Sequence, residues 1–245
     1  VMRTYIEFTR HKVAGVQAGK GQKLPEPPPV VVREATEAEV GRLKGETLLL
    51  AGQRDLARTA LLIPYLRGER DPALLAALGI TEADGGDPAK ARRLLEAAAT
   101  AHVARPRAYV ELARLRLVEA RAQPEGAAGK VSARQTAAVL EPLLTARNQP
   151  PALPELYELI AEAWTHSEVT PKAAQLAALD EGVRLFPRNA GLVYANASLK
   201  ARSGQIAEAE SLIRLGLRVA ADAGTREKFE ILKAGLPPAP AAPKQ

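Results

Sequence analysis

The side chains that most often bind metals or move protons are scarce in this 245-residue chain, which has three histidines and no cysteine. His11, His102 and His166 lie far apart, and none has a second ligand at helical spacing. A zinc site needs three or four such ligands close together, so we expect no metal and no cofactor. The lack of cysteine also excludes disulfides, iron–sulfur clusters and cysteine nucleophiles.

Hydroxyl nucleophiles and neighbouring carboxylates are the other candidates for catalysis. No serine lies in the Gly-x-Ser-x-Gly pattern of a nucleophile elbow. Glu155, Glu158 and Glu162, with Glu168 nearby, follow the spacing of one helix face. That spacing indicates a solvated surface or a binding surface for a cation. We therefore expect no catalytic residue and no enzyme activity in this chain.

A glycine-rich stretch, Gly15 to Gly21, matches a phosphate-binding loop only in part. The motif needs four residues between its glycines, then Lys followed by Ser or Thr, where a strand turns into a helix. Gly15 and Gly19 enclose only three residues, Gly21 follows Lys20, and a proline-rich segment comes next. The stretch therefore predicts a flexible linker.

The formal net charge of +6 is unevenly distributed. Residues 1–24 carry five basic residues against Glu7, or +4, whereas residues 38–235 carry +3 with both signs interleaved. A nucleic-acid-binding protein normally concentrates basic residues on one face. We therefore expect no nucleic-acid binding by the body. Binding of DNA or RNA through the basic N-terminal arm is kept as a weaker hypothesis for function. No apolar run reaches the length of a membrane span.

The chain divides by composition into an N-terminal part and a long helical body. Residues 3–9 are rich in β-branched and aromatic residues and predict one strand. This strand either pairs with a preceding domain or packs on the body. We assign residues 1–24 to an N-terminal arm, residues 25–35 to a proline-rich linker, and residues 236–245 to a disordered tail.

The body has an internal period of 34 residues, which separates Pro72 from Pro106. Large and small apolar residues recur within this unit at fixed positions. Counted from Pro72, they are Leu75, Leu78, Gly79, Ala91, Leu95 and Ala98. This pattern resembles the tetratricopeptide repeat (TPR), a helix–turn–helix unit of 34 residues. The resemblance implies an all-α, right-handed superhelix.

About five degenerate units cover most of the chain. Their first residues are Ala38, Pro72, Pro106, Pro154 and Ala190. The third unit is longer because a loop around residues 123–130 is inserted between its two helices. The array then spans residues 38–223, and residues 224–235 predict a capping helix that covers the last apolar face.

Several residues depart from the repeat pattern or stand out within it. Asn196 replaces a usual leucine and Asp180 a usual small residue. Pro64 and Pro142 lie within second helices, where each should kink or locally break its helix. Trp164 is the only tryptophan, and its position predicts packing in the core.

In tetratricopeptide arrays the first helices line a concave groove, which makes their exposed positions the candidate binding site. We expect an apolar centre, including Ala73 and Leu117, with arginines on one side and an acidic patch in the fourth unit. The fifth and ninth positions hold no Lys or Asn, which argues against a clamp for a peptide's terminal carboxylate. The candidate residues are Arg42, Glu46, Ala76, Ile80, Arg107, Val110, Arg114, Glu158, Glu162, Tyr194 and Ser198.

These features favour a non-enzymatic module that binds a peptide or a partner helix in the groove. Alternatively, the groove is filled by the chain's own N-terminal segment or by a second copy in a homo-oligomer. A different hypothesis is that the chain is the C-terminal accessory region of a larger bacterial enzyme with a peptidase-like domain upstream. The start at Val1, the strand-like residues 3–9 and the proline-rich linker motivate this alternative.

Overall fold

The computed structural model describes residues 32–237. The predicted strand, the glycine-rich stretch and most of the C-terminal tail lie outside these residues. The chain divides into two compact units, residues 1–35 and 36–245. The fold described below is that of the second unit.

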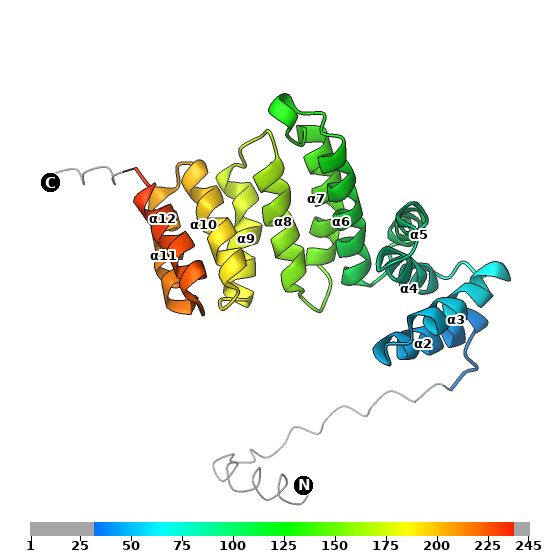
Figure 1. The fold of residues 1–245 in the computed structure, drawn as a ribbon. Coiled ribbons are helices and arrows are strands. Elements are labelled where there is room, and N and C mark those ends of the chain that lie inside the picture. The colour runs from blue at the N-terminus through cyan, green and yellow to red at the C-terminus, as the bar shows by residue number, and fades with distance from the viewer. Residues whose placement is uncertain (1–31, 238–245) are drawn as a thin grey trace, which may run out of the picture. The chain divides into compact units, whose positions relative to one another are not determined.

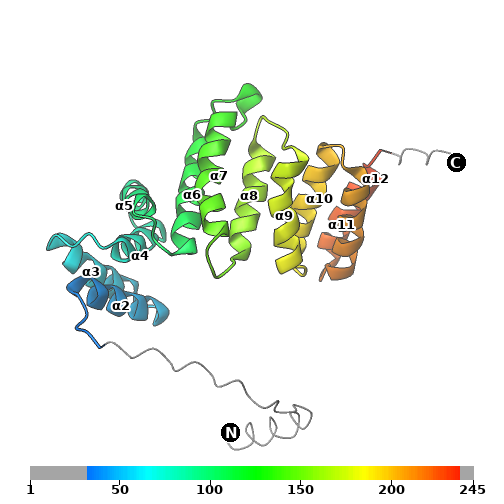
Figure 2. The same cartoon turned by 180° about the vertical axis from the view of Figure 1, so that it is seen from behind.

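The described residues form eleven α-helices, arranged as five consecutive pairs and a final single helix (Figures 1 and 2). The only strand-like feature among them is an isolated bridge between Val131 and Ser167, so the predicted all-α class is confirmed. The first helices of the pairs are α2 Glu37–Leu50, α4 Pro72–Ala83, α6 Pro106–Ala122, α8 Pro154–His166 and α10 Ala190–Arg202. The second helices are α3 Arg54–Leu66, α5 Pro88–Thr100, α7 Ala133–Arg147, α9 Ala173–Leu185 and α11 Ile206–Val219, and α12 is Ala223–Ala234.

Local sequence explains where several helices begin. Thr36 accepts a hydrogen bond from the Glu39 backbone N–H (3.2 Å), and the Glu39 carboxylate accepts one from the Thr36 N–H (2.8 Å). This is a capping box. Asp71 caps α4 by accepting from the Leu74 N–H (2.9 Å), with Pro72 in the first turn. These caps satisfy backbone donors that have no partner inside the helix.

The core repeats with the units. Each second helix contributes at least one fully buried aliphatic side chain, and close-packed small residues let the helices of a pair approach. A Cβ at Gly79 would lie 2.8 Å from the Leu95 Cγ, so glycine is required there. Trp164 is 6% exposed and belongs to the core, as predicted. The five aliphatic residues are Leu61, Leu95, Leu143, Leu179 and Ile213.

The sequence predicted a kink or a local break at each internal proline, and the structure shows no break at either. Pro64 lies in the last turn of α3, and α7 continues through Pro142. A proline leaves the carbonyl four residues earlier without its helical donor. For Pro142 that carbonyl belongs to Ala138, and it accepts a hydrogen bond of 2.7 Å from the Arg116 guanidinium. A side chain of the neighbouring helix thus replaces the missing backbone donor.

The first helices form one continuous layer, which positions the candidate site. Each of them contacts the first helix of the next pair, from α2 through α10. The second helices of the described body make no comparable contacts with one another and pack on their own partner and on the next first helix. We call the exposed side of the first-helix layer the inner face.

Candidate binding site on the inner face

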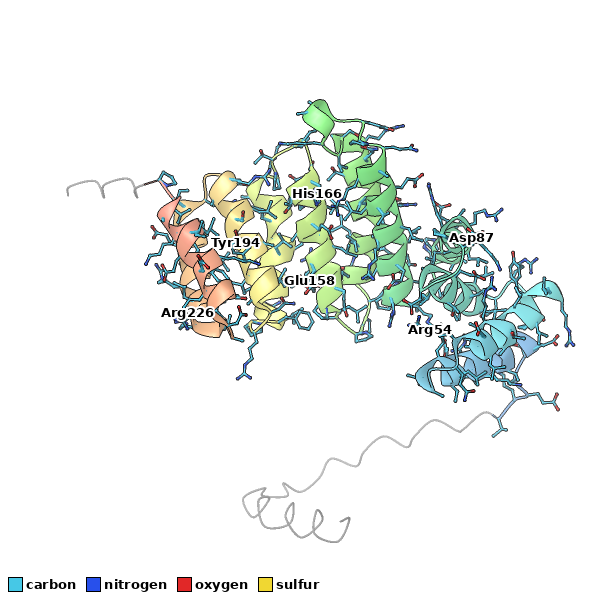
Figure 3. All side chains as sticks on the ribbon, viewed as in Figure 1. Arg54, Asp87, Glu158, His166, Tyr194 and Arg226 are labelled. Atoms are coloured by element: carbon cyan, nitrogen blue, oxygen red, sulfur yellow. The ribbon has the colours of Figure 1, made fainter. Side chains whose placement is uncertain are left out.

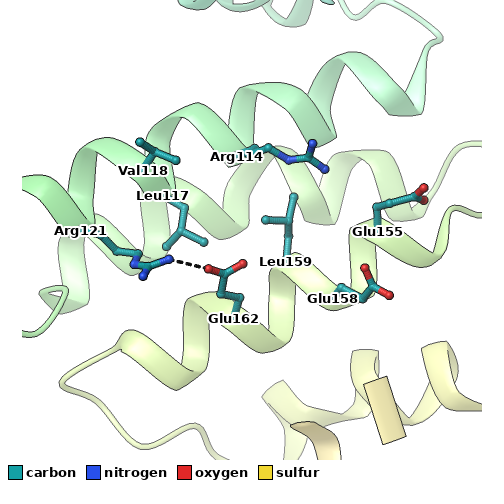
Figure 4. Close-up of a pocket in the computed structure, with 8 residues that line it drawn as sticks. All are labelled: Arg114, Leu117, Val118, Arg121, Glu155, Glu158, Leu159 and Glu162. Atoms are coloured by element: carbon teal, nitrogen blue, oxygen red, sulfur yellow. Dashed lines mark hydrogen bonds and ion pairs between the residues drawn. The ribbon is translucent and has the colours of Figure 1, made fainter. Parts of the chain in front are cut away.

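The first helices hold two pockets. The α6–α8 pocket has a volume of about 280 Å³, and the α2–α4 pocket has a volume of about 450 Å³. Figure 4 shows the eight residues that line the first, Arg114, Leu117, Val118, Arg121, Glu155, Glu158, Leu159 and Glu162. The second is lined by Glu46, Leu49, Leu50, Arg54, Ala77, Ile80, Thr81, Asp84, Arg105 and Arg107.

The α6–α8 pocket has arginines on one wall and carboxylates on the other (Figure 4). Arg121 and Glu162 close one end with a hydrogen bond of 2.8 Å between Nη1 and Oε1. Arg114 lies seven residues before Arg121. Among residues 32–237 its one ion pair is with Glu111 of its own helix, at 3.5 Å. This ion pair is too long for a good hydrogen bond, so the Arg114 guanidinium, about half exposed, has donors to spare.

The acidic wall is also only partly neutralised. Glu158 accepts a hydrogen bond of 2.6 Å from the Asn189 amide, which carries no charge. Glu155 is exposed and has no partner within residues 32–237. Between the two walls, Leu117 and Leu159 are 2% and 6% exposed. The pocket therefore combines an apolar floor with an arginine on one side and two carboxylates on the other.

The α2–α4 pocket has a paired carboxylate at its centre. Glu46 binds both Arg42 of its own helix (3.0 Å) and Arg105 (2.6 Å). Ile80 and Arg107 complete the part of this pocket that the sequence predicted. Its central carboxylate therefore already holds two guanidinium groups, whereas Arg54 and Arg107 have only longer ion pairs, at 3.8 Å with Asp84 and 3.7 Å with Glu111.

The predicted apolar centre of the groove is wrong in detail. Ala76 is 0% exposed and Val110 and Leu117 are each 2% exposed, so they lie under the surface. First helices pack directly on one another, and this packing covers the side of α4 and α6 that the repeat pattern assigned to the groove. The surface there is formed by charged side chains together with the 62%-exposed Val118, while Ala73 and Ile80 remain partly exposed.

The remaining predicted residues lie farther along the layer. Tyr194 and Ser198 on α10 are partly buried, and neither lines the two pockets. Figure 3 shows Tyr194 on α10 next to the end of the array. Its ring packs edge-on against Phe229 of α12, with centroids 5.5 Å apart. Sequence reasoning placed Glu155 on the same helix face as Glu158 and Glu162, but it missed Arg121, Val118 and Leu159 as lining residues. The seven-residue step from Arg114 to Arg121 is a signal for a shared helix face.

The carboxylates with the most perturbed pKa values are structural. Glu82 is fully buried and accepts hydrogen bonds from Arg58 Nε (2.9 Å) and Lys90 Nζ (2.8 Å), which ties α3, α4 and α5 together. Burial alone would raise the pKa of Glu82, but the hydrogen bonds from Arg58 and Lys90 lower it to about 2. On Glu168, hydrogen bonds from the Ala127 and Ala133 N–H groups lower the carboxyl pKa.

The described residues contain no group of three or more His, Asp or Glu side chains that could hold a metal ion. His166 faces only Glu162, with 3.9 Å between Nε2 and Oε1, and His102 lies elsewhere at the end of α5. Within the same residues no helix is both long and apolar enough to span a bilayer.

No protein-family model and no curated protein matches the sequence. Solved structures do match. A crystal structure of MamA shares 16% identity with a TM-score of 0.55, covering 83% of this chain and 98% of MamA. TTC0263, a thermophilic TPR protein in Thermus thermophilus, shares 19% identity with a TM-score of 0.50, covering 81% and 100%. Acl4, the assembly chaperone of RpL4, shares 16% identity with a TM-score of 0.53, covering 82% and 84%.

These likenesses, at identities below one fifth, concern the fold. Together with the five helix pairs and their repeating core, they define an all-α, TPR-like repeat protein.

Proposed function

We propose that this chain is a non-enzymatic protein-interaction module that holds a peptide or a partner helix on its inner face. The observation that carries the proposal is the α6–α8 pocket. There Arg114 stands opposite Glu155 and Glu158 across the buried Leu117 and Leu159. A ligand with one apolar anchor flanked by an acidic and a basic residue would match this arrangement, because apolar pockets with a few placed charges favour peptide recognition.

The state of the carboxylates supports a role without catalysis. A general acid or base works best with a pKa near the operating pH. Hydrogen bonds instead lower the pKa of Glu82 to about 2 and also lower the pKa of Glu168 and Glu181. The Glu181 shift comes chiefly from Arg147. The fold of Acl4, named as an assembly chaperone of RpL4, shows that a similar solenoid serves in a protein that acts on another protein.

A peptide selection with charge-reversal variants tests the proposal. Peptides from a random library displayed on phage are selected on the whole chain and then measured against Arg114→Glu and Glu155→Arg. A peptide with an acidic residue at Arg114 should bind Arg114→Glu about tenfold more weakly or worse, because a like-charge contact replaces an attractive one. A peptide with a basic residue at Glu155 should lose affinity for Glu155→Arg in the same way. Arg93→Glu is the matched control, since Arg93 is exposed on α5 and lines neither pocket.

Two results would contradict the proposal. One is a selection that enriches no peptide, and the other is a set of peptides that bind both pocket variants as well as the unaltered chain. Sedimentation of the free chain completes the experiment. If it self-associates and Arg114→Glu makes it monomeric, a second copy occupies the face in place of a peptide.

A further inference from the structure

A polar cluster lies where the third repeat meets the fourth, formed by the buried Tyr157 and the partly buried Glu181 and Arg147. The Tyr157 hydroxyl donates to Glu181 Oε1 at 2.9 Å, and Arg147 Nε donates to Glu181 Oε2 at 2.9 Å. Burial and, next, the hydrogen bond to Glu181 raise the pKa of Tyr157 to about 12. The cluster connects α7, α8 and α9. The Tyr157 hydroxyl, the Glu181 carboxylate and the Arg147 guanidinium each have a hydrogen-bond partner within it.

The third repeat has the same tyrosine without the same partners. Tyr109 and Tyr157 are each the fourth residue of their first helix, counted from Pro106 and Pro154. Arg147 lies seven residues before the start of α8, and Ala99 lies seven residues before the start of α6. By the same counting, Thr145 takes the place of Glu181, nine residues before the next first helix. Two small residues thus stand where the next repeat has a guanidinium and a carboxylate.

The consequence is a pocket of about 490 Å³ between α5, α6 and α7, which we call the Tyr109 pocket. Ala99, Thr145 and Tyr109 all line it. Tyr109 is 3% exposed, and its buried hydroxyl has no hydrogen-bond partner among the residues that the structure describes. A buried polar group without a partner is costly, so this hydroxyl favours a polar guest.

The charges around the pocket determine the kind of guest. Glu96 and Glu141 line the wall together with Arg116, whose guanidinium is shared between them at 3.7 Å and 3.1 Å. Glu96 also accepts a hydrogen bond of 3.0 Å from Arg92 Nε, and Arg92 in turn pairs with Glu119. Three carboxylates, those of Glu96, Glu119 and Glu141, are thus shared between two guanidinium groups. The remaining charge is negative, which favours a cation over an anion.

We propose that the Tyr109 pocket binds an arginine side chain of a partner protein. The guanidinium takes the place that Arg147 has one repeat later, donates to the Glu96 and Glu141 carboxylates, and donates to the Tyr109 hydroxyl oxygen. Its planar set of five donors suits several acceptors at once, whereas the ammonium of lysine acts as a point charge. This site uses residues of α6 other than those of the α6–α8 pocket, so its test is independent of the proposed inner-face function.

The direct experiment titrates the ¹⁵N-labelled chain with N-acetyl-arginine amide and follows the backbone resonances of Ala99, His102 and Thr145. A single side chain of this size should bind with a Kd of about 1–10 mM. N-acetyl-citrulline amide has the same shape without the charge, and we expect it to bind about tenfold more weakly or not at all.

Two variants separate ligand binding from general structure. Tyr109→Phe removes only the unpaired hydroxyl and should weaken binding about fivefold, whereas Tyr157→Phe, the matched control one repeat later, should leave it unchanged. The double variant Ala99→Arg, Thr145→Glu copies the Arg147–Glu181 pair into the pocket. It should abolish probe binding and raise the unfolding midpoint by about 2–4 °C.

The proposal is overturned if citrulline shifts the resonances as strongly as arginine, or if Tyr109→Phe binds the probe unchanged. It is equally overturned if no saturable shift appears at about ten times the expected Kd, in which case the pocket holds only water. Should the double variant fail to fold, the comparison of Tyr109→Phe with Tyr157→Phe still decides the question.

Discussion

The buried Glu82 makes the stability of this solenoid depend on pH in a way that one substitution should abolish. The pKa of Glu82 is lowered from its ordinary value of 4.5 to about 2. At about 1.36 kcal/mol per pKa unit, this difference contributes about 3 kcal/mol to the free energy of unfolding. Removal of one partner from a buried ion pair costs about 3–5 kcal/mol, and the partly exposed Arg58 places Glu82 at the lower end of that range.

The direction follows from the order of protonation. The folded-state pKa lies below the unfolded one, so the unfolded chain takes up the proton first as the pH falls. The stabilisation is complete above about pH 4.5 and is lost progressively as the pH falls towards 2. We expect Glu82→Gln to cost about 3 kcal/mol at pH 7 and to cost progressively less as the pH falls through this window.

Urea unfolding, followed by circular dichroism at several pH values between 7 and 2, measures this difference. Glu155→Gln is the matched control, because this exposed carboxylate has no partner in the part of the chain that the structure describes, and it should change the unfolding free energy by less than about 0.5 kcal/mol. A cost for Glu82→Gln below about 1 kcal/mol at pH 7, or a cost that stays constant down to pH 2, would refute the reasoning.

Three further predictions concern stability and are measured by the same unfolding assay. Asp180→Ala should destabilise by about 1–2 kcal/mol because it leaves the 5%-exposed Lys200 without its carboxylate at 3.1 Å, and the half-exposed Asp180 keeps this cost below that of a fully buried pair. Adding Lys200→Leu should recover most of the loss, and equal stability of the single and double variants contradicts this. Gly216→Ala should lower the unfolding free energy by about 2 kcal/mol or more, since the new Cβ would lie 2.1 Å from the Phe229 ring. Adding Phe229→Leu should relieve the overlap, and an unchanged stability of Gly216→Ala argues against the tight contact of α11 with α12. His102→Gly should raise the unfolding free energy by up to about 1 kcal/mol, because His102 has a left-handed backbone with φ 53° that glycine adopts without strain. A loss of stability contradicts this and shows that the imidazole makes a compensating interaction.

Much of the fold could be predicted from the repeat spacing alone. Four first helices begin at the residues that open the predicted units, and α2 begins one residue earlier. This succeeded because small residues such as Gly79 and buried ones such as Leu95 recur at fixed steps, and their packing sets the helix pairs. A period read from one sequence is therefore enough to place the helices and the residues packed within each pair.

The candidate site could be predicted only in part, because it depends on contacts between distant residues. The sequence pattern does not state how far adjacent first helices bury each other, so Ala76 and Val110 were expected at the surface and lie in the core. Arg121 and Glu162 are separated by 41 positions, and no local pattern shows that they pair.

The two departures from the repeat consensus show the same limit. Asn196 and Asp180 stand out in the sequence as separate anomalies. In the structure the Asn196 amide donates to Asp180 Oδ1 at 3.0 Å, and Lys200 pairs with the other oxygen of the same carboxylate. Their polar groups are partners of each other, which only the packing of α9 against α10 reveals.

The central claim is that the α6–α8 pocket on the inner face holds the partner. Val118 is suited to test it directly, because it lines this pocket and is 62% exposed. A benzophenone amino acid placed at Val118, and at Arg93 as the control, is irradiated in the presence of a selected peptide, and the products are mapped by mass spectrometry. The account predicts covalent capture from position 118 and none from position 93. Capture of equal yield from both positions, or from position 93 alone, would contradict it.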